Sequence, residues 1–178
     1  MEVTRIRALR GPNLWSHHTA IQSVVICTAE EDAVSSIPGF EAKLRARFPE
    51  VSPFQPVGHL ESVSLARVLE LVALGLQAQA GCPVTFSCTT PTVDKHVYQV
   101  VVEYSEEEVG HLAMEWAEKL CNSALHDTPF DLQAALEALR ELDEDVRLGP
   151  STGSIVDAAV AGPGNGSAGI SAHCSPPG

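Results

Sequence analysis

The chain alternates between two patterns of apolar residues, one with the period of a strand and one with the period of a helix. Four runs rich in β-branched and other apolar residues predict strands, because such side chains suit a half-buried pleated surface. These runs are residues 2–9, 20–28, 83–89 and 97–104. Turn-forming residues separate the members of each pair: Gly11-Pro12-Asn13 ends the first strand, and residues 90–95 connect the last two.

Other stretches repeat apolar residues every three or four positions, which predicts helices with one buried face. A short helix around Phe40 ends before Pro49, whose ring cannot fit a helix interior. The most regular helix begins near Ser62 or Ser64 and ends at Gly81, a residue that suits a C-cap. Its apolar stripe consists of Leu65, Val68, Leu69, Val72 and Leu76.

Two more helices are predicted in the last third of the chain. Ser105 and Glu108 have the spacing of a capping box, which places a helix start at Ser105. Thr128-Pro129 predicts a further start, with proline at the first helical position. The apolar stripes of these helices are Val109, Leu112, Ala113, Trp116 and Leu120, then Leu132, Leu136, Leu139 and Leu142.

The order of elements is two strands, two helices, two strands and two helices, so strands do not alternate singly with helices. This order favours an α+β fold, a mixed and largely antiparallel sheet packed against several helices, over a doubly wound parallel sheet. We predict one domain over residues 1–148. Residues 149–161 begin another helix, and residues 162–178 hold five Gly, three Pro and no charged residue, which predicts a disordered tail.

Composition narrows the function classes. The 178 residues carry a net charge of −12, and residues 61–178 supply all of it. We expect no nucleic-acid partner, because phosphate contacts need clustered Lys and Arg. No apolar run is long enough to cross a membrane, and the first ten residues lack the apolar core of a signal peptide. We therefore expect a cytoplasmic protein with no membrane partner.

Candidate chemistry is sparse. The five cysteines form no CxxC pair, and the seven histidines lack HExxH spacing, so no metal ligands are predicted. No G-x-S-x-G motif is present, and we expect Cys27 and Cys121 to be buried, unreactive thiols. The stretch from Gly149 to Ser154 could meet an anion at a helix start, but helix capping explains its hydroxyl groups equally well. The residues alone predict no catalytic, cofactor-binding or metal site.

Five motifs nevertheless occur in the order seen in one bacterial enzyme family. They are Leu9-Arg10-Gly11-Pro12-Asn13-Leu14-Trp15, Ile37-Pro38-Gly39-Phe40, the stretch from Ala73 to Val84, Val97–Tyr104 and Leu148–Val156. In these motifs, over residues 1 to about 161, the chain resembles the N-terminal domain of cyanophycin synthetases.

The resemblance implies part of a three-part, ATP- and magnesium-dependent ligase. Such enzymes add aspartate and arginine to multi-L-arginyl-poly-L-aspartate, or cyanophycin, through an ATP-grasp and a Mur-ligase-like domain. Residues 149–161 lie where the family's ATP-grasp region begins, and the sequence leaves the family pattern at Gly162. The motifs of both ligase domains are absent here, so we expect a truncated chain that binds no ATP or magnesium itself.

Some members of the family carry HxxEH on the helix before the ALxLQ motif, at a site associated with cutting the polymer. The matching stretch here runs from Arg67 to Leu71, and only Glu70 remains of the three ligands. Since one carboxylate seldom holds a metal, we expect Glu70 to be solvated or paired with Arg67 at i,i+3.

The sequence thus predicts a non-catalytic domain that binds or tethers cyanophycin near the ligase sites, through a surface that the sequence does not identify. Two alternatives stay open: a residual metal-dependent cyanophycin hydrolase, and a structural module that supports a homo-oligomer of synthetase chains.

Overall fold

A computed structural model describes residues 1–15, 17–55 and 62–160, with side chains as far as Gly149. The predicted tail, residues 162–178, lies outside the described residues. The elements follow the expected order of two strands, two helices, two strands and two helices. They are β1 (Glu2–Leu9), β2 (Ala20–Ile26), a 3-10 turn (Val34–Ser36), α1 (Phe40–Arg47), α2 (Leu65–Ala80), β3 (Ser87–Pro91), β4 (Val97–Glu103), α3 (Glu107–His126) and α4 (Leu132–Val160).

The four strands form one antiparallel sheet in the order β1-β2-β4-β3. β2 and β4 occupy the centre, and they are the strands richest in valine and isoleucine. The α+β prediction is therefore confirmed.

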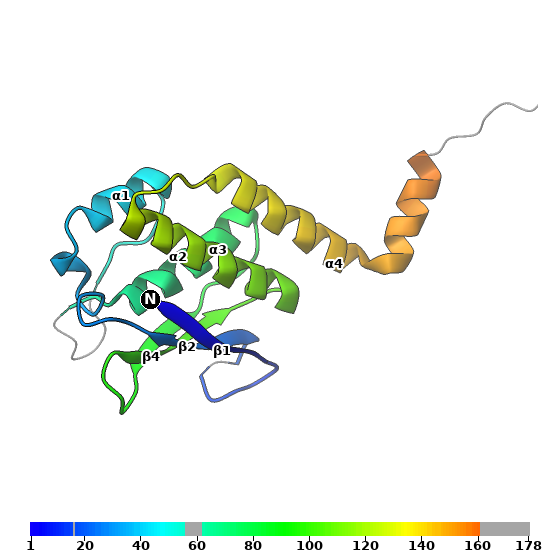
Figure 1. Ribbon diagram of the computed structural model, residues 1–178. Helices are drawn as coiled ribbons and strands as arrows, with labels where there is room; N and C mark the ends of the chain where they lie inside the picture. Colours follow the sequence, from blue (N-terminus) through cyan, green and yellow to red (C-terminus); the bar gives the residue numbers. More distant parts are fainter. Residues whose placement is uncertain (16, 56–61, 161–178) are drawn as a thin grey trace, which may run out of the picture.

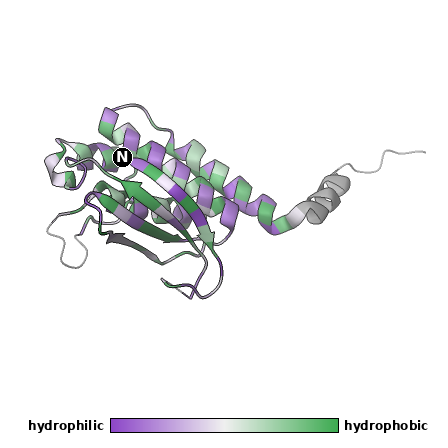
Figure 2. Cartoon of the chain, turned by 60° about the horizontal axis from the view of Figure 1, so that its bottom comes forward, coloured by the Kyte–Doolittle hydropathy of each residue, from purple (hydrophilic) through white to green (hydrophobic). Residues whose placement is uncertain are grey.

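The helices gather on one side of this sheet, and the other side has no helical cover (Figures 1 and 2). Side chains that alternate along the central strands, such as Ile21, Val25 and Val100, point into the core beneath the helices. The predicted stripe of α2 lies in the same core, and all five of its residues are fully buried. Hydrophobic burial between α2, α3 and one sheet face thus holds the domain together.

Helix α2 begins and ends at the predicted residues. Ser64 is its N-cap, and the Ser64 hydroxyl accepts a hydrogen bond from the backbone N–H of Arg67. Gly81 follows the last turn with φ of 104°, a left-handed conformation that favours glycine.

The strand predicted over 83–89 is shifted to Ser87–Pro91. The backbone N–H groups of Thr85 and Phe86 donate to the Glu103 carboxylate, at 2.8 and 2.7 Å, instead of to a strand. The ladder then continues to Pro91, which is tolerated at the end of an edge strand.

The predicted capping box is wrong. α3 begins at Glu107 with Glu106 as its N-cap, and no side chain caps it. The Ser105 hydroxyl donates instead to Asp143 of α4, with 3.4 Å between the oxygens. A tertiary contact has therefore replaced the local one.

The predicted helix start at Thr128-Pro129 is also wrong, since α4 begins at Leu132. The side chain of Arg47 donates to the Thr128 carbonyl and holds this segment as a connection. Asp131 supplies the cap, because its Oδ1 accepts from the backbone N–H of Ala134 at 3.0 Å. Farther on, α4 breaks at Gly149, with φ of 65°, and helix resumes beyond it, as expected from the 150–154 stretch.

Candidate functional site

The stretch of α2 that matches HxxEH in some members of the family holds an internal ion pair. Glu70 of α2 is fully buried. The guanidinium of Arg67 donates to its Oε1, and the Thr89 hydroxyl of β3 donates to its Oε2. Both carboxylate oxygens are thus already bonded, and Leu71 offers no donor atom. The expected ion pair with Arg67 is present, although Glu70 is buried and not solvated.

Within the part of the chain that the structure describes, no three His, Cys, Asp or Glu side chains are grouped to hold a metal ion.

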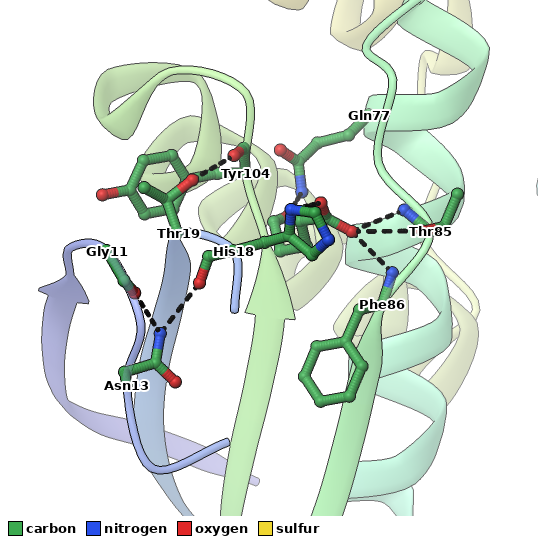
Figure 3. Close-up of polar contacts among 9 residues, drawn as sticks. Gly11, Asn13, His18, Thr19, Gln77, Thr85, Phe86 and Tyr104 are labelled. Carbon is green, nitrogen blue, oxygen red and sulfur yellow. Dashed lines mark hydrogen bonds and ion pairs between the residues drawn. The ribbon is translucent and has the colours of Figure 1, made fainter. Parts of the chain in front are cut away.

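A second buried carboxylate, Glu103, fixes one end of the sheet. Besides the backbone N–H groups of Thr85 and Phe86 on its Oε2, it has His18 Nδ1 3.6 Å from its Oε1. Its backbone carbonyl accepts from Gln77 of α2 at 2.9 Å. Figure 3 shows these donors converging from α2, from the residues just before β3 and from the loop before β2. A carboxylate used in this way joins elements together and is poorly placed to act as a general base.

The loop between β1 and β2 is held by contacts in the same region (Figure 3). Asn13 Nδ2 donates to the carbonyls of Gly11 and His18, at 3.3 and 2.8 Å. The Thr19 hydroxyl donates to the Tyr104 carbonyl at 2.8 Å. These bonds fix the turn that the sequence predicted at Gly11-Pro12-Asn13.

A third polar cluster joins the β3–β4 hairpin to the segment before α1. Asp32 Oδ2 bonds His96 Nδ1, and Asp32 Oδ1 accepts from the Tyr98 hydroxyl at 2.9 Å. Burial and this hydrogen bond to a carboxylate raise the pKa of Tyr98 to about 12. No local pattern in the sequence indicates this cluster, because more than sixty residues separate Asp32 from its partners.

The two thiols expected to be inert lie in the core. Cys27 and Cys121 are both buried. Burial raises the pKa of Cys27 to about 12 and raises that of Cys121 as well. Because the thiolate is the nucleophilic form, neither residue is suited to covalent catalysis near neutral pH.

The sheet face away from the helices is the remaining candidate for a binding surface. Successive side chains of a strand point to opposite faces, and those on this face include the polar side chains of Arg7, Gln22 and Gln99. Arg5 and Arg7 are exposed, and neither has a carboxylate partner among the described residues. By contrast Arg10, at the end of the same strand, pairs with Glu107 of α3 at 3.1 Å. This face therefore presents free positive charge on an otherwise acidic domain.

Within the described part of the chain, no helix is both long enough and apolar enough to cross a membrane.

Comparison with known proteins agrees with the motifs. The sequence model of the cyanophycin synthase-like N-terminal domain matches residues 23–126, from β2 through α3. Among curated proteins, the cyanophycin synthetases of Trichormus variabilis and of a Nostoc species are each 35% identical to this chain over 174 residues. The match covers 89% of this chain and 19% of each relative.

The cyanophycin synthetase of a Synechocystis species is 34% identical over 176 residues, which cover 90% of this chain and 20% of that protein. The chain thus spans about a fifth of the length of the curated relatives that it matches. The family match, the ordered motifs and these relatives agree on one conclusion: this chain belongs to the cyanophycin synthase-like N-terminal domain family.

Proposed function

We propose that this domain is a non-catalytic module of a cyanophycin synthetase and that it holds the arginine–aspartate polymer. The observation that carries the proposal is the sheet face without helical cover, which presents Arg5 and Arg7 beside the amide side chains of Gln22 and Gln99. A broad, polar and partly cationic face suits an extended, charged peptide better than it suits a small molecule.

Charge on the rest of the domain supports the same partner. Cyanophycin carries guanidinium groups as well as carboxylates. The net charge of −12 attracts the guanidinium groups at long range, since opposite fields raise the rate of encounter. Exposed acidic side chains lie on α3 and α4, including Glu108, Glu115, Glu137 and Glu141. The guanidinium groups of the polymer can thus contact the acidic helices, while its carboxylates contact the cationic sheet face of the same domain.

The non-catalytic part of the proposal is supported by α2. The Arg67 guanidinium and the Thr89 hydroxyl already bond both oxygens of Glu70, so a hydrolytic metal would have to displace two buried partners. A residual hydrolase is accordingly the weaker alternative.

Binding of soluble cyanophycin fragments to the full 178-residue chain tests the proposal. Titration calorimetry should detect binding that weakens as salt rises, because the contacts are ionic. An uncharged peptide of the same length is the matched control and should not bind. Fragments should keep their length when ATP, magnesium, aspartate and arginine are added. The absence of binding at low salt, or elongation of the fragments, would contradict the proposal.

A structural role in assembling synthetase chains is a second candidate. α4 runs beyond the other helices (Figure 1), and Leu148 near its break is 46% exposed. A helix that extends past the domain leaves Leu148 accessible to another part of a large enzyme. Sedimentation velocity separates the two roles: an oligomer that forms without polymer and is lost in Leu148→Glu supports the structural role.

A further inference from the structure

Strand β1 contains an irregularity at its middle. Thr4 pairs with Val24 and Arg7 pairs with Gln22, so two residues of β1, Arg5 and Ile6, lie opposite one residue of β2. This arrangement is a β-bulge, which bends a strand and turns its side chains toward new directions. Arg5 has φ of 50°, a left-handed conformation that is uncommon for a residue with a side chain.

The bulge gathers three consecutive side chains around one hollow of the uncovered sheet face. In a regular strand, Ile6 would point away from Arg5 and Arg7. Here all three line a hollow of about 390 Å³, together with Gln22, Val24 and Gln99. Strained backbone at such a place suggests a functional demand, because a regular strand would cost less.

The polar groups of the hollow are already oriented. Arg7 donates from Nε and Nη2 to Gln22 Oε1, at 2.8 and 2.6 Å. Gln22 is only 4% exposed, so this bond holds the guanidinium against a nearly fixed partner. The Gln22 Nε2 group has no acceptor among the described residues and stays available as a donor. Arg5 adds a second guanidinium without a carboxylate partner in the same part of the chain.

We propose that this hollow is a carboxylate subsite, and that it takes a free carboxylate of an extended peptide, either that of an arginine attached to an aspartyl side chain or that of the C-terminus. Guanidinium groups bind carboxylates through paired hydrogen bonds, and a guanidinium held in place loses less freedom on binding. Ile6 and Val24 supply an apolar wall for the carbon atoms that carry the carboxylate. The subsite rests on the proposed polymer binding and specifies which charge of the polymer is bound here.

Four of the six residues of this subsite lie outside the family match. Arg5, Ile6, Arg7 and Gln22 all precede residue 23, where the match to the family model begins. The subsite is therefore inferred from the bulge and the hollow of this chain.

The test uses poly-L-aspartate as a probe that carries carboxylates and no guanidinium groups. NMR of the full chain should show the side-chain NH₂ signals of Gln22 shifting as the probe is added. The double variant Arg5→Gln, Arg7→Gln should weaken binding about tenfold or more, because it removes two charged hydrogen-bond donors. Arg140→Gln is the matched control: Arg140 is exposed on α4 and also lacks a carboxylate partner among the described residues. It should bind the probe as the wild type does.

Two results would overturn the subsite: unmoved Gln22 signals at saturating probe, or equal binding by the double variant and the wild type. The binding comparison requires that the double variant keeps the wild-type thermal midpoint. If it does not, the single variant Arg5→Gln replaces it, since Arg5 makes no side-chain bond in the described chain. Failure of the subsite differs from failure of the proposed function. Cyanophycin fragments that bind wild type and double variant equally leave the function standing, whereas fragments that bind neither contradict the function even if poly-L-aspartate moves Gln22.

Discussion

The guanidinium of Arg67 bonds the carboxylate of Glu70 one turn farther along α2, and Glu70 is fully buried while Arg67 is 22% exposed. A buried carboxylate is costly unless opposite charge and hydrogen bonds compensate it. Here Arg67 supplies the charge from the protein surface, and Thr89 supplies a further hydrogen bond from the sheet. The pair therefore ties α2 to β3 as well as balancing a charge.

Removal of Arg67 should destabilise the domain strongly. Arg67→Ala leaves Glu70 buried without its counter-charge, and breaking such a pair costs about 3–5 kcal/mol. The free energy of unfolding from urea titration measures this loss. Arg10→Ala is the control, because the exposed Arg10–Glu107 pair should contribute only about 0–1 kcal/mol. Arg67→Met combined with Glu70→Gln should recover much of the loss; a double variant no more stable than Arg67→Ala would contradict the explanation.

Gly110 should not tolerate a methyl group, although it lies in a helix. A Cβ atom there would lie 2.7 Å from the Cβ of Tyr104 and 2.9 Å from Cγ1 of Ile21. Alanine gains about 1 kcal/mol of helix propensity over glycine, but overpacking costs about 1–3 kcal/mol. We expect Gly110→Ala to lose stability in urea titration.

Gly75→Ala is the matched control for Gly110, because its new Cβ would meet the rim of the Phe48 ring at 3.0 Å. A ring at the end of a side chain can shift more easily than atoms beside the backbone, so the loss should be smaller. A Gly110→Ala protein as stable as the wild type would show that α3 is free to move away from the sheet.

The spacing of apolar residues predicts the buried helix faces, but it does not predict side-chain hydrogen bonds to residues far away in the chain. The α2 stripe from Leu65 to Leu76 was predicted from spacing alone, and the structure buries every residue of it. The capping box at Ser105 failed because Asp143, thirty-eight residues away, bonds the serine hydroxyl. A local motif cannot reveal that its side chain has a better partner elsewhere.

The candidate site was hidden for a related reason. The bulge at Arg5 and Ile6 is a property of the pairing between β1 and β2, and the spacing of residues in β1 does not show it. The ion pair of Glu70 was accessible from the i,i+3 spacing with Arg67, but its complete burial depends on β3 crossing the same face of α2.

The ion pairs of Asp127 should make stability depend on acid pH. Hydrogen bonds from Arg47 and Lys43 of α1 lower the pKa of the Asp127 carboxyl below its ordinary value. A lowered folded-state pKa adds stability above the unfolded-state pKa, near 3.8, and this stability is lost as the pH falls through the folded-state value.

Asp127→Asn isolates this charge, because asparagine also tolerates the left-handed conformation of this residue, whose φ is 54°. The variant should be slightly less stable than the wild type at pH 7, and the difference should shrink as the pH is lowered below about 4 and in high salt. Urea midpoints of both proteins across this pH range measure the effect. A difference that grows on acidification would contradict the assigned sign.

The chain should not shorten cyanophycin in a metal-dependent reaction. Hydrolysis by a metal requires ligands with lone pairs that converge on one point, with a position left open for water. At the family position on α2, the side chains are a guanidinium, a bonded carboxylate and the alkyl group of Leu71, so only Glu70 has lone pairs for a cation. We expect the polymer length, measured by gel electrophoresis, to stay constant with zinc, manganese or magnesium present, with or without chelator. Glu70→Gln should give the same result as the wild type. Shortening that a chelator stops and that Glu70→Gln abolishes would replace the binding module with a hydrolase.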